Sequence, residues 1–165
     1  MELRRPVVVV MGGDPEKNNR LSRIEELLEK TDTLLLCGIT GNLFLKANGG
    51  NIGRSVYNKD LLPKAAEILS KAREKGVKVL LPIDAYTANE LNRTVKPSLE
   101  GASGMFDDKM SGDIGPRTVS LFTNAILTAG TIIAEGSAGV CKLPAFAGGT
   151  EALAKAIKQS SADKI

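Results

Sequence analysis

Residues 6–13 read PVVVVMGG, an unbroken apolar run that ends in two glycines. Such a run is typical of a strand buried on both faces of a parallel sheet, and glycine permits the tight turn that follows. Residues 18–30 then place Leu21, Ile24 and Leu28 at helical spacing, with charged residues between them. The stretch therefore predicts a strand, a glycine turn and an amphipathic helix over residues 18–30.

The same pattern returns along the rest of the chain. Further apolar runs at Thr33–Leu36, Lys78–Ile83 and Thr131–Ala134 predict three more strands. The remaining helical signals are a segment capped by Asp60 that extends to Lys75, a segment over Thr118–Thr128 opened by Pro116, and a last helix over Glu151–Ser160.

Alternating strands and helices predict an α/β fold. We expect one domain over residues 1–165, with a doubly wound, Rossmann-like parallel sheet of about four main strands and helices on both faces. The glycine turns would then meet in a crevice at the carboxyl edge of the sheet, where ligands bind in such folds. Between the third strand and the Pro116 helix we expect a short hairpin over Ala85–Leu91 and an irregular excursion over Asn92–Gly112.

The composition excludes several function classes. The chain of 165 residues contains no histidine, which excludes histidine-based acid–base catalysis and most zinc sites. The net charge of +3 is spread along the chain and aromatic residues are only 4%, so we expect no nucleic-acid partner. No apolar run approaches a membrane span. Two cysteines without a pairing pattern fit a reducing compartment, so we expect a soluble, intracellular protein with no metal site of its own.

The glycine turns are the candidates for chemistry. Gly12-Gly13 and the run Gly136-Ser137-Ala138-Gly139 could present backbone amides to a phosphate at a helix N-terminus. They could equally serve the close packing that any strand-to-helix turn needs. Neither turn is followed by the Gly-Lys-Ser/Thr of a P-loop, and the three spaced glycines of a dinucleotide site are absent.

Seven blocks in order resemble the C-terminal, nucleotide-binding domain of the phosphoglycerate kinase family. They are Met11-Gly12-Gly13, residues 24–30 with 32–35, residues 44–47, residues 51–55, residues 80–84, residues 113–118, and Gly139-Val140 with residues 145–147 and 149–150. The resemblance implies a domain that binds magnesium with ADP or ATP, if the ancestral site survives. In the family, two lobes close to move a phosphoryl group between 1,3-bisphosphoglycerate and ADP. The resemblance also suggests that the N-terminal lobe and the last strands are absent from this chain.

The resemblance assigns roles to individual residues. It implies a nucleotide site that contains Gly12, Gly13, Gly38, Gly136, Gly139 and Val140. The family places lysines where this chain has Lys17, in an uncertain register, and Arg20, so these are the candidate catalytic residues.

Other positions depart from the family pattern. Glu16 lies in the altered stretch after the paired glycines, Glu135 stands for an asparagine near the phosphates, and Lys142 stands for the glutamate that accepts from the ribose. At close range Glu135 would repel a nucleotide anion by about 1 to 4 kcal/mol. Cys37 and Ile39 replace two glycines of the adenine pocket and should narrow it.

These departures favour a catalytically inactive, phosphoglycerate-kinase-like domain that serves as a binding or structural module. The alternatives are the nucleotide-binding part of a phosphoglycerate kinase that needs a missing lobe or a partner chain, and a weak nucleotide-binding regulator. Whichever function applies, a parallel sheet without its last strands exposes an edge. We therefore expect another protein chain or a second copy to cover that edge.

Overall fold

The computed structural model describes residues 2–165 and confirms the predicted α/β class. Its main sheet has five parallel strands in the order β3-β2-β1-β7-β8. These strands are β1 (Val7–Met11), β2 (Thr33–Leu36), β3 (Lys78–Leu80), β7 (Thr131–Glu135) and β8 (Asp163–Lys164). Four of them coincide with the predicted apolar runs, although β3 ends three residues earlier than expected. The short strand β8 adds a fifth.

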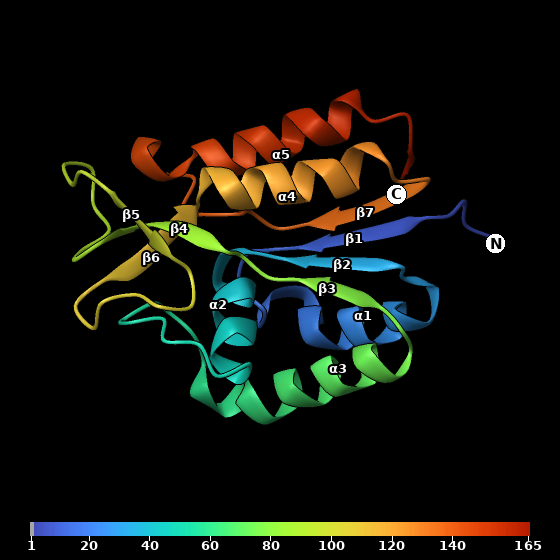
Figure 1. Ribbon diagram of the computed structural model, residues 1–165, viewed down its shortest axis with the longest axis horizontal. Coiled ribbons are helices and arrows are strands. Elements are labelled where there is room, and N and C mark those ends of the chain that lie inside the picture. The colour runs from blue at the N-terminus through green and yellow to red at the C-terminus, as the bar shows by residue number, and fades with distance from the viewer. Residues whose placement is uncertain (1) are drawn as a thin grey trace.

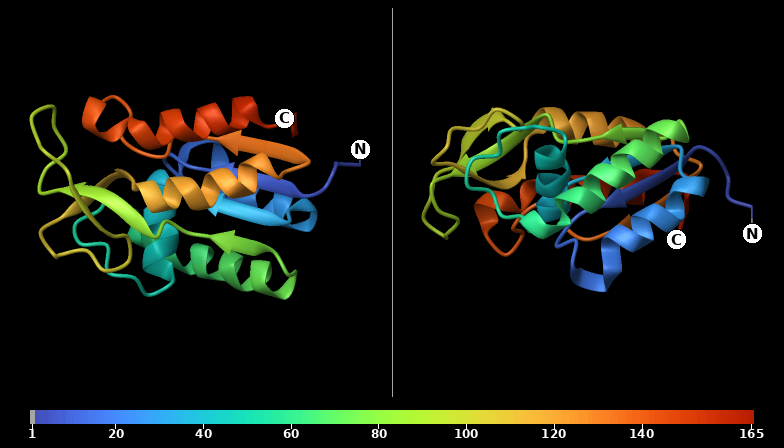
Figure 2. Two further views of the ribbon diagram at one scale, coloured as in Figure 1. Left: turned by 45° about the horizontal axis from the view of Figure 1, so that its top comes forward. Right: turned by 90° about the horizontal axis from the view of Figure 1, so that it is seen from below.

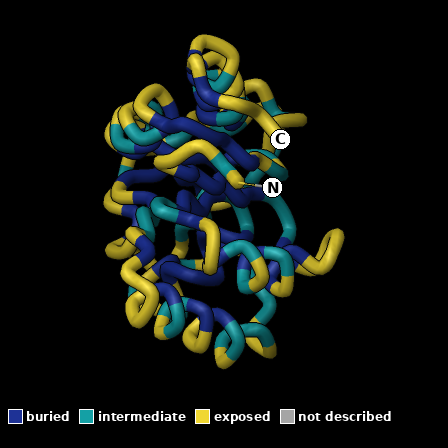
Figure 3. Tube along the Cα trace, turned by 90° about the vertical axis from the view of Figure 1, so that its right-hand side faces the viewer, coloured by how far each residue is buried: buried dark blue, intermediate teal, exposed yellow. Residues whose placement is uncertain are grey.

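Helices cover both faces of this sheet, as Figure 1 shows. They are α1 (Arg20–Leu27), α2 (Gly38–Ala47), α3 (Leu62–Glu74), α4 (Pro116–Leu127) and α5 (Gly148–Gln159). Side chains alternate along β1: Val7 and Val9 pack with residues of α1, α2 and α3, whereas Val8 and Val10 pack with residues of α4 and α5. The uninterrupted valine run is therefore explained by burial on both faces. Figure 3 shows the buried strands between the more exposed helices.

The region between β3 and α4 differs from the expectation. The predicted hairpin over 85–91 is wrong, and residues 92–112 are not simply irregular. Three strands, β4 (Asp84–Ala88), β5 (Ser98–Gly101) and β6 (Met110–Ile114), form a separate antiparallel sheet in the order β5-β4-β6. This small sheet lies beyond the carboxyl ends of the main strands, beside α2 (Figures 1 and 2).

Three helix starts also differ from the prediction, and the first of these is α5, which begins at Gly148 instead of Glu151. The helix expected from residue 18 begins at Arg20, because Asn18 and Asn19 adopt left-handed backbone conformations with φ of 56° and 49°. The cap expected from Asp60 is provided by Asn58, whose side chain accepts a hydrogen bond from the Asp60 amide at 2.9 Å. Short 3₁₀ turns at Lys17–Asn19, Leu28–Lys30, Lys59–Leu61 and Pro144–Phe146 complete the secondary structure.

Among the helices of residues 2–165, none combines the length and the apolar character needed to cross a membrane.

Candidate functional site

The turns after β1 and β7 interlock at the carboxyl edge of the main sheet. The amide of Gly12 donates to the Glu135 carbonyl at 2.8 Å, and the amide of Gly13 donates to the Ser137 carbonyl at 2.8 Å. The Gly13 carbonyl in turn accepts from the backbone amide and the hydroxyl of Thr40 in α2, both at 2.8 Å. Residues predicted to share one crevice therefore meet there.

A cavity of about 410 Å³ opens beside these turns. It is lined by Gly13, Asp14, Lys17, Arg20, Gly38, Ile39, Asn42, Ser111, Gly112, Ser137, Ala138, Gly139, Val140, Cys141 and Lys142. The volume lies within the range of small-molecule sites. Eight of the residues to which the family resemblance assigned a role or a departure are in this lining, including both candidate catalytic residues. Gly12, Gly136, Glu16 and Glu135 lie outside it.

Close backbone packing accounts for the glycines of these turns. A Cβ atom at Gly12 would lie 2.3 Å from the Ser137 carbonyl oxygen, and one at Gly136 would lie 2.3 Å from the Gly12 carbonyl oxygen. At Gly38 the nearest atom would again be the Ser137 carbonyl oxygen, at 2.5 Å. No side chain fits at such distances, so the protein's own backbone requires these glycines whether or not a ligand binds.

Arg20 is held between the two turns. Its Nη1 atom donates to the Gly12 carbonyl at 2.6 Å and lies 2.9 Å from where a Cβ would stand at Gly13 or Gly136. The side chain is only 6% exposed. Its Nε atom is buried and has no hydrogen-bond partner among residues 2–165, although Glu135 Oε2 lies 3.8 Å away. Arg20 therefore fixes the turns, while it also lines the cavity.

Glu135 pairs with arginines instead of standing free. Its Oε1 atom accepts a hydrogen bond from Arg23 Nε, and its Oε2 atom forms the longer ion pair with Arg20. These ion pairs offset part of the Glu135 charge, and the repulsion of a nucleotide anion by Glu135 stays a prediction. Sequence reasoning missed this cluster because Arg20 and Arg23 lie on α1, more than a hundred residues from Glu135.

The other altered positions lie at the rim or in the interior. Glu16 is exposed, and its Oε1 atom accepts from Asn58 Nδ2 at 3.0 Å. Lys142 is exposed and lines the cavity. Ile39 also lines the cavity, and the narrowing expected from its side chain stays a prediction. Cys37 does not, because it is 1% exposed and packs in the core, where burial raises the pKa of its thiol to about 12.

Two buried aspartates hold helix N-termini near the cavity. Asp84 accepts from the amides of Arg117 at 2.9 Å and Thr118 at 2.8 Å, at the start of α4. Asp113 Oδ2 accepts from the Gly149 amide of α5 at 2.8 Å. Burial raises the pKa of Asp113 to about 6, against the opposing effect of its backbone hydrogen bonds. Both carboxylates are used to cap helices.

The cavity offers more cations than carboxylates. Lys17, Arg20 and Lys142 line it, whereas Asp14 is its single acidic lining residue. In the part of the chain that the structure describes, no three histidine, cysteine or acidic side chains gather into a possible metal centre.

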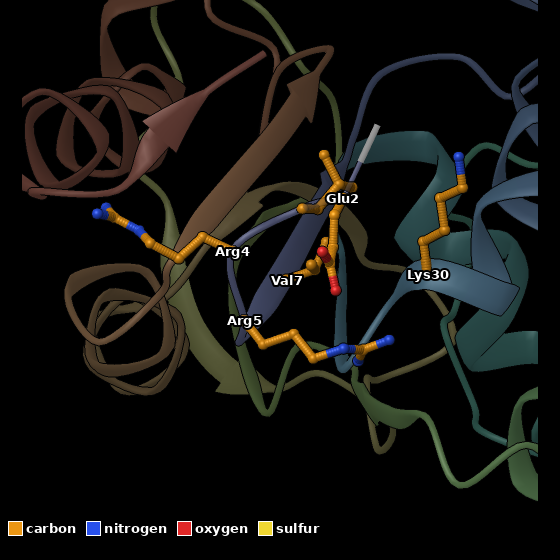
Figure 4. A pocket seen from close by; sticks show the side chains of 6 residues that line it. Glu2, Arg4, Arg5, Val7 and Lys30 are labelled. Carbon is orange, nitrogen blue, oxygen red and sulfur yellow. The ribbon is translucent and has the colours of Figure 1, made fainter.

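A larger cavity of about 630 Å³ lies at the opposite, amino edge of the sheet. Figure 4 shows that the side chains of Arg4, Arg5 and Lys30 there point in different directions. Arg4 donates to the Ser161 carbonyl at 2.9 Å, and Arg5 forms an ion pair with Asp32. Because the two arginines are bound to other parts of the protein, they do not converge on a common ligand.

Comparisons with known proteins match the whole chain. The sequence model described as phosphoglycerate kinase matches residues 1–165. The chain is 39% identical to phosphoglycerate kinase of Clostridium kluyveri and 37% identical to that of Clostridium botulinum, in each case over 98% of this chain. It spans 40% of the length of these relatives.

Solved structures of phosphoglycerate kinases also match this chain. Phosphoglycerate kinase from Coxiella burnetii superposes with a TM-score of 0.92 at 35% identity, covering 98% of this chain and 42% of that one. The enzyme from Pyrococcus horikoshii OT3 superposes with a TM-score of 0.79 at 26% identity, covering 95% of this chain and 40% of that one.

Proposed function

Because the chain belongs to the phosphoglycerate kinase family, we propose that it is a single-domain unit of the nucleotide-binding type that does not transfer phosphoryl groups by itself. Its role is that of a binding or structural module. The observation that carries this proposal is the use of Arg20, whose guanidinium is bound to the Gly12 carbonyl and faced by Glu135. Phosphoryl transfer depends on positioned positive charge, and here that charge is partly neutralised.

The crevice is the proposed ligand site. Its glycines, Val140 and Lys17 surround a volume suited to a small molecule, and its charged lining residues are mainly cationic. A nucleotide carrying magnesium would meet Lys17 at this site, and the metal would neutralise the charge of the phosphates. Lys142 offers only hydrogen-bond donors, so it cannot accept from a ribose hydroxyl.

The second candidate is the nucleotide-binding part of an active phosphoglycerate kinase, completed by a further lobe. It is favoured by the open cavity and by Lys17 in its lining. In this case the acceptor substrate would be bound by residues that this chain does not contain.

An activity assay tests both candidates. The chain would be given ATP, magnesium and 3-phosphoglycerate, with formation of 1,3-bisphosphoglycerate followed by a coupled enzyme. The first proposal predicts no turnover above background, alone or with an added N-terminal lobe of the Coxiella burnetii enzyme. Turnover of the chain alone would contradict it. Turnover that depends on the added lobe would favour the second candidate.

We also propose a partner at β8. Within the described residues this strand pairs with β7 only, so its other side presents unpaired backbone groups. A strand from another chain or a second copy would satisfy them. Size-exclusion chromatography with light scattering at micromolar concentration tests self-association, and a purely monomeric mass would exclude a second copy as the partner.

A further inference from the structure

We infer that Glu135, which lies behind the cavity lining, is an internal counter-ion of the lining residue Arg20 and of Arg23, and so weakens binding of ligands with a diphosphate group in the crevice. This inference deepens the proposed function. It rests on that proposal in one respect, which is that the crevice is the ligand site. The carboxylate belongs to β7, and the two guanidinium groups belong to α1. Both pairs are between side chains of this chain, so the neutralisation is built into the fold.

The geometry of Arg20 does not depend on Glu135. Its Nη1 atom is fixed by the Gly12 carbonyl at 2.6 Å and enclosed by the glycines of the two turns. Removal of the Glu135 charge would therefore leave the guanidinium in place. A positively charged group that is already positioned binds an anion without a further cost of ordering.

Arg20 also keeps an unused donor. Its Nε atom is buried without a hydrogen-bond partner in the described chain, and the 3.8 Å to Glu135 Oε2 is too long for a hydrogen bond. Buried donors are usually satisfied, and this one faces Glu135 outside the cavity lining, so it marks an incomplete pairing between the two side chains and not an opening to the cavity. Phosphate oxygens are strong acceptors for guanidinium donors.

Charge arithmetic sets the direction of the effect. Arg20, Arg23 and Glu135 together carry +1, and replacing the carboxylate by an amide raises this to +2. Lys17 lines the same cavity and would act on the same ligand. A diphosphate carries more negative charge than a single phosphate monoester and should gain most from the change.

The test compares Glu135→Gln with the wild-type chain and with Glu29→Gln as a matched control. Glu29 pairs with Lys75 outside the cavity lining, so the control changes the net charge equally and leaves the cluster intact. Inorganic pyrophosphate with magnesium is titrated by calorimetry at low salt. We expect Glu135→Gln to bind at least tenfold more tightly than the wild type, and Glu29→Gln to bind within about twofold of it. We also expect the gain to shrink as salt rises.

Folding is checked first by thermal unfolding, and Glu135→Asn provides a second neutral variant. Equal pyrophosphate affinity in the wild type and a folded neutral variant would overturn the inference, as would the absence of binding in all of them. Neither result depends on phosphoryl transfer. The activity assay of the wild-type chain therefore tests the proposed function independently.

Discussion

Replacing Gly136 by alanine should destabilise the fold through a backbone collision, which a matched glycine elsewhere does not share. Gly136 has a φ of 80°, and a Cβ there would lie 2.3 Å from the Gly12 carbonyl oxygen and 2.9 Å from Arg20 Nη1. Gly76, after α3, has a similar φ of 71° with no atom within 4 Å of its Cβ position. Comparison of the two variants separates left-handed strain, which both share, from the contact between turns.

The expected losses in the free energy of unfolding follow from the left-handed strain and from the contact between the turns. Alanine in a left-handed conformation costs about 1 to 2 kcal/mol, so Gly76→Ala should lower the free energy of unfolding by about that amount. Gly136→Ala adds a collision with backbone, for which overpacking suggests about 1 to 3 kcal/mol more. Urea unfolding followed by circular dichroism measures both free energies. Equal losses would refute the argument that the contact between the turns requires glycine at position 136.

Three further predictions concern buried groups. Burial raises the pKa of Asp113 to about 6, so protonation of this carboxyl stabilises the folded state. The contribution to the free energy of unfolding is complete below about pH 4 and is lost as the pH rises through 6, a change of about 3 kcal/mol. Urea unfolding at pH 4 and pH 7 should therefore show a smaller pH-dependent loss for Asp113→Asn than for the wild type, and an equal loss would contradict this. The buried Thr118 hydroxyl donates to Asp84 Oδ1 at 2.6 Å, so Thr118→Val should lose about 2 kcal/mol in thermal or urea unfolding and Thr118→Ser clearly less. A thiol reagent at pH 8 should label exposed Cys141 and leave Cys37 unlabelled until urea unfolds the chain, and labelling of both in the native state would argue against the buried position of Cys37.

The main sheet could be predicted because its strands carry their own signal. Val7–Met11 and the first three residues of β7, 131–133, are buried on both faces, so their continuous apolar runs are visible without tertiary information. The small sheet carried no such signal. Its strands are polar and pair across long separations, as Tyr86 does with Asp113, so nothing local identifies them.

The candidate site could be predicted in outline and not in its charge pattern. The glycine turns located the crevice, and the family resemblance added Lys17 and Arg20, which do line it. The pairing of Glu135 with Arg20 and Arg23 depends on how β7 packs beside α1, which the sequence alone does not reveal. The capping of α4 by Asp84 escaped prediction for the same reason, since the two are more than thirty residues apart.

The positive charge of Arg20, the buried cation of this crevice, is committed to the Gly12 carbonyl and to Glu135 of the protein itself. The most direct measurement is a calorimetric titration of the wild-type chain with magnesium and ADP up to millimolar concentration, paired with its thermal midpoint. The account predicts binding no tighter than about millimolar, and a midpoint that micromolar ADP does not raise. Saturable binding in the micromolar range, with a raised midpoint, would contradict it and would identify an intact nucleotide site.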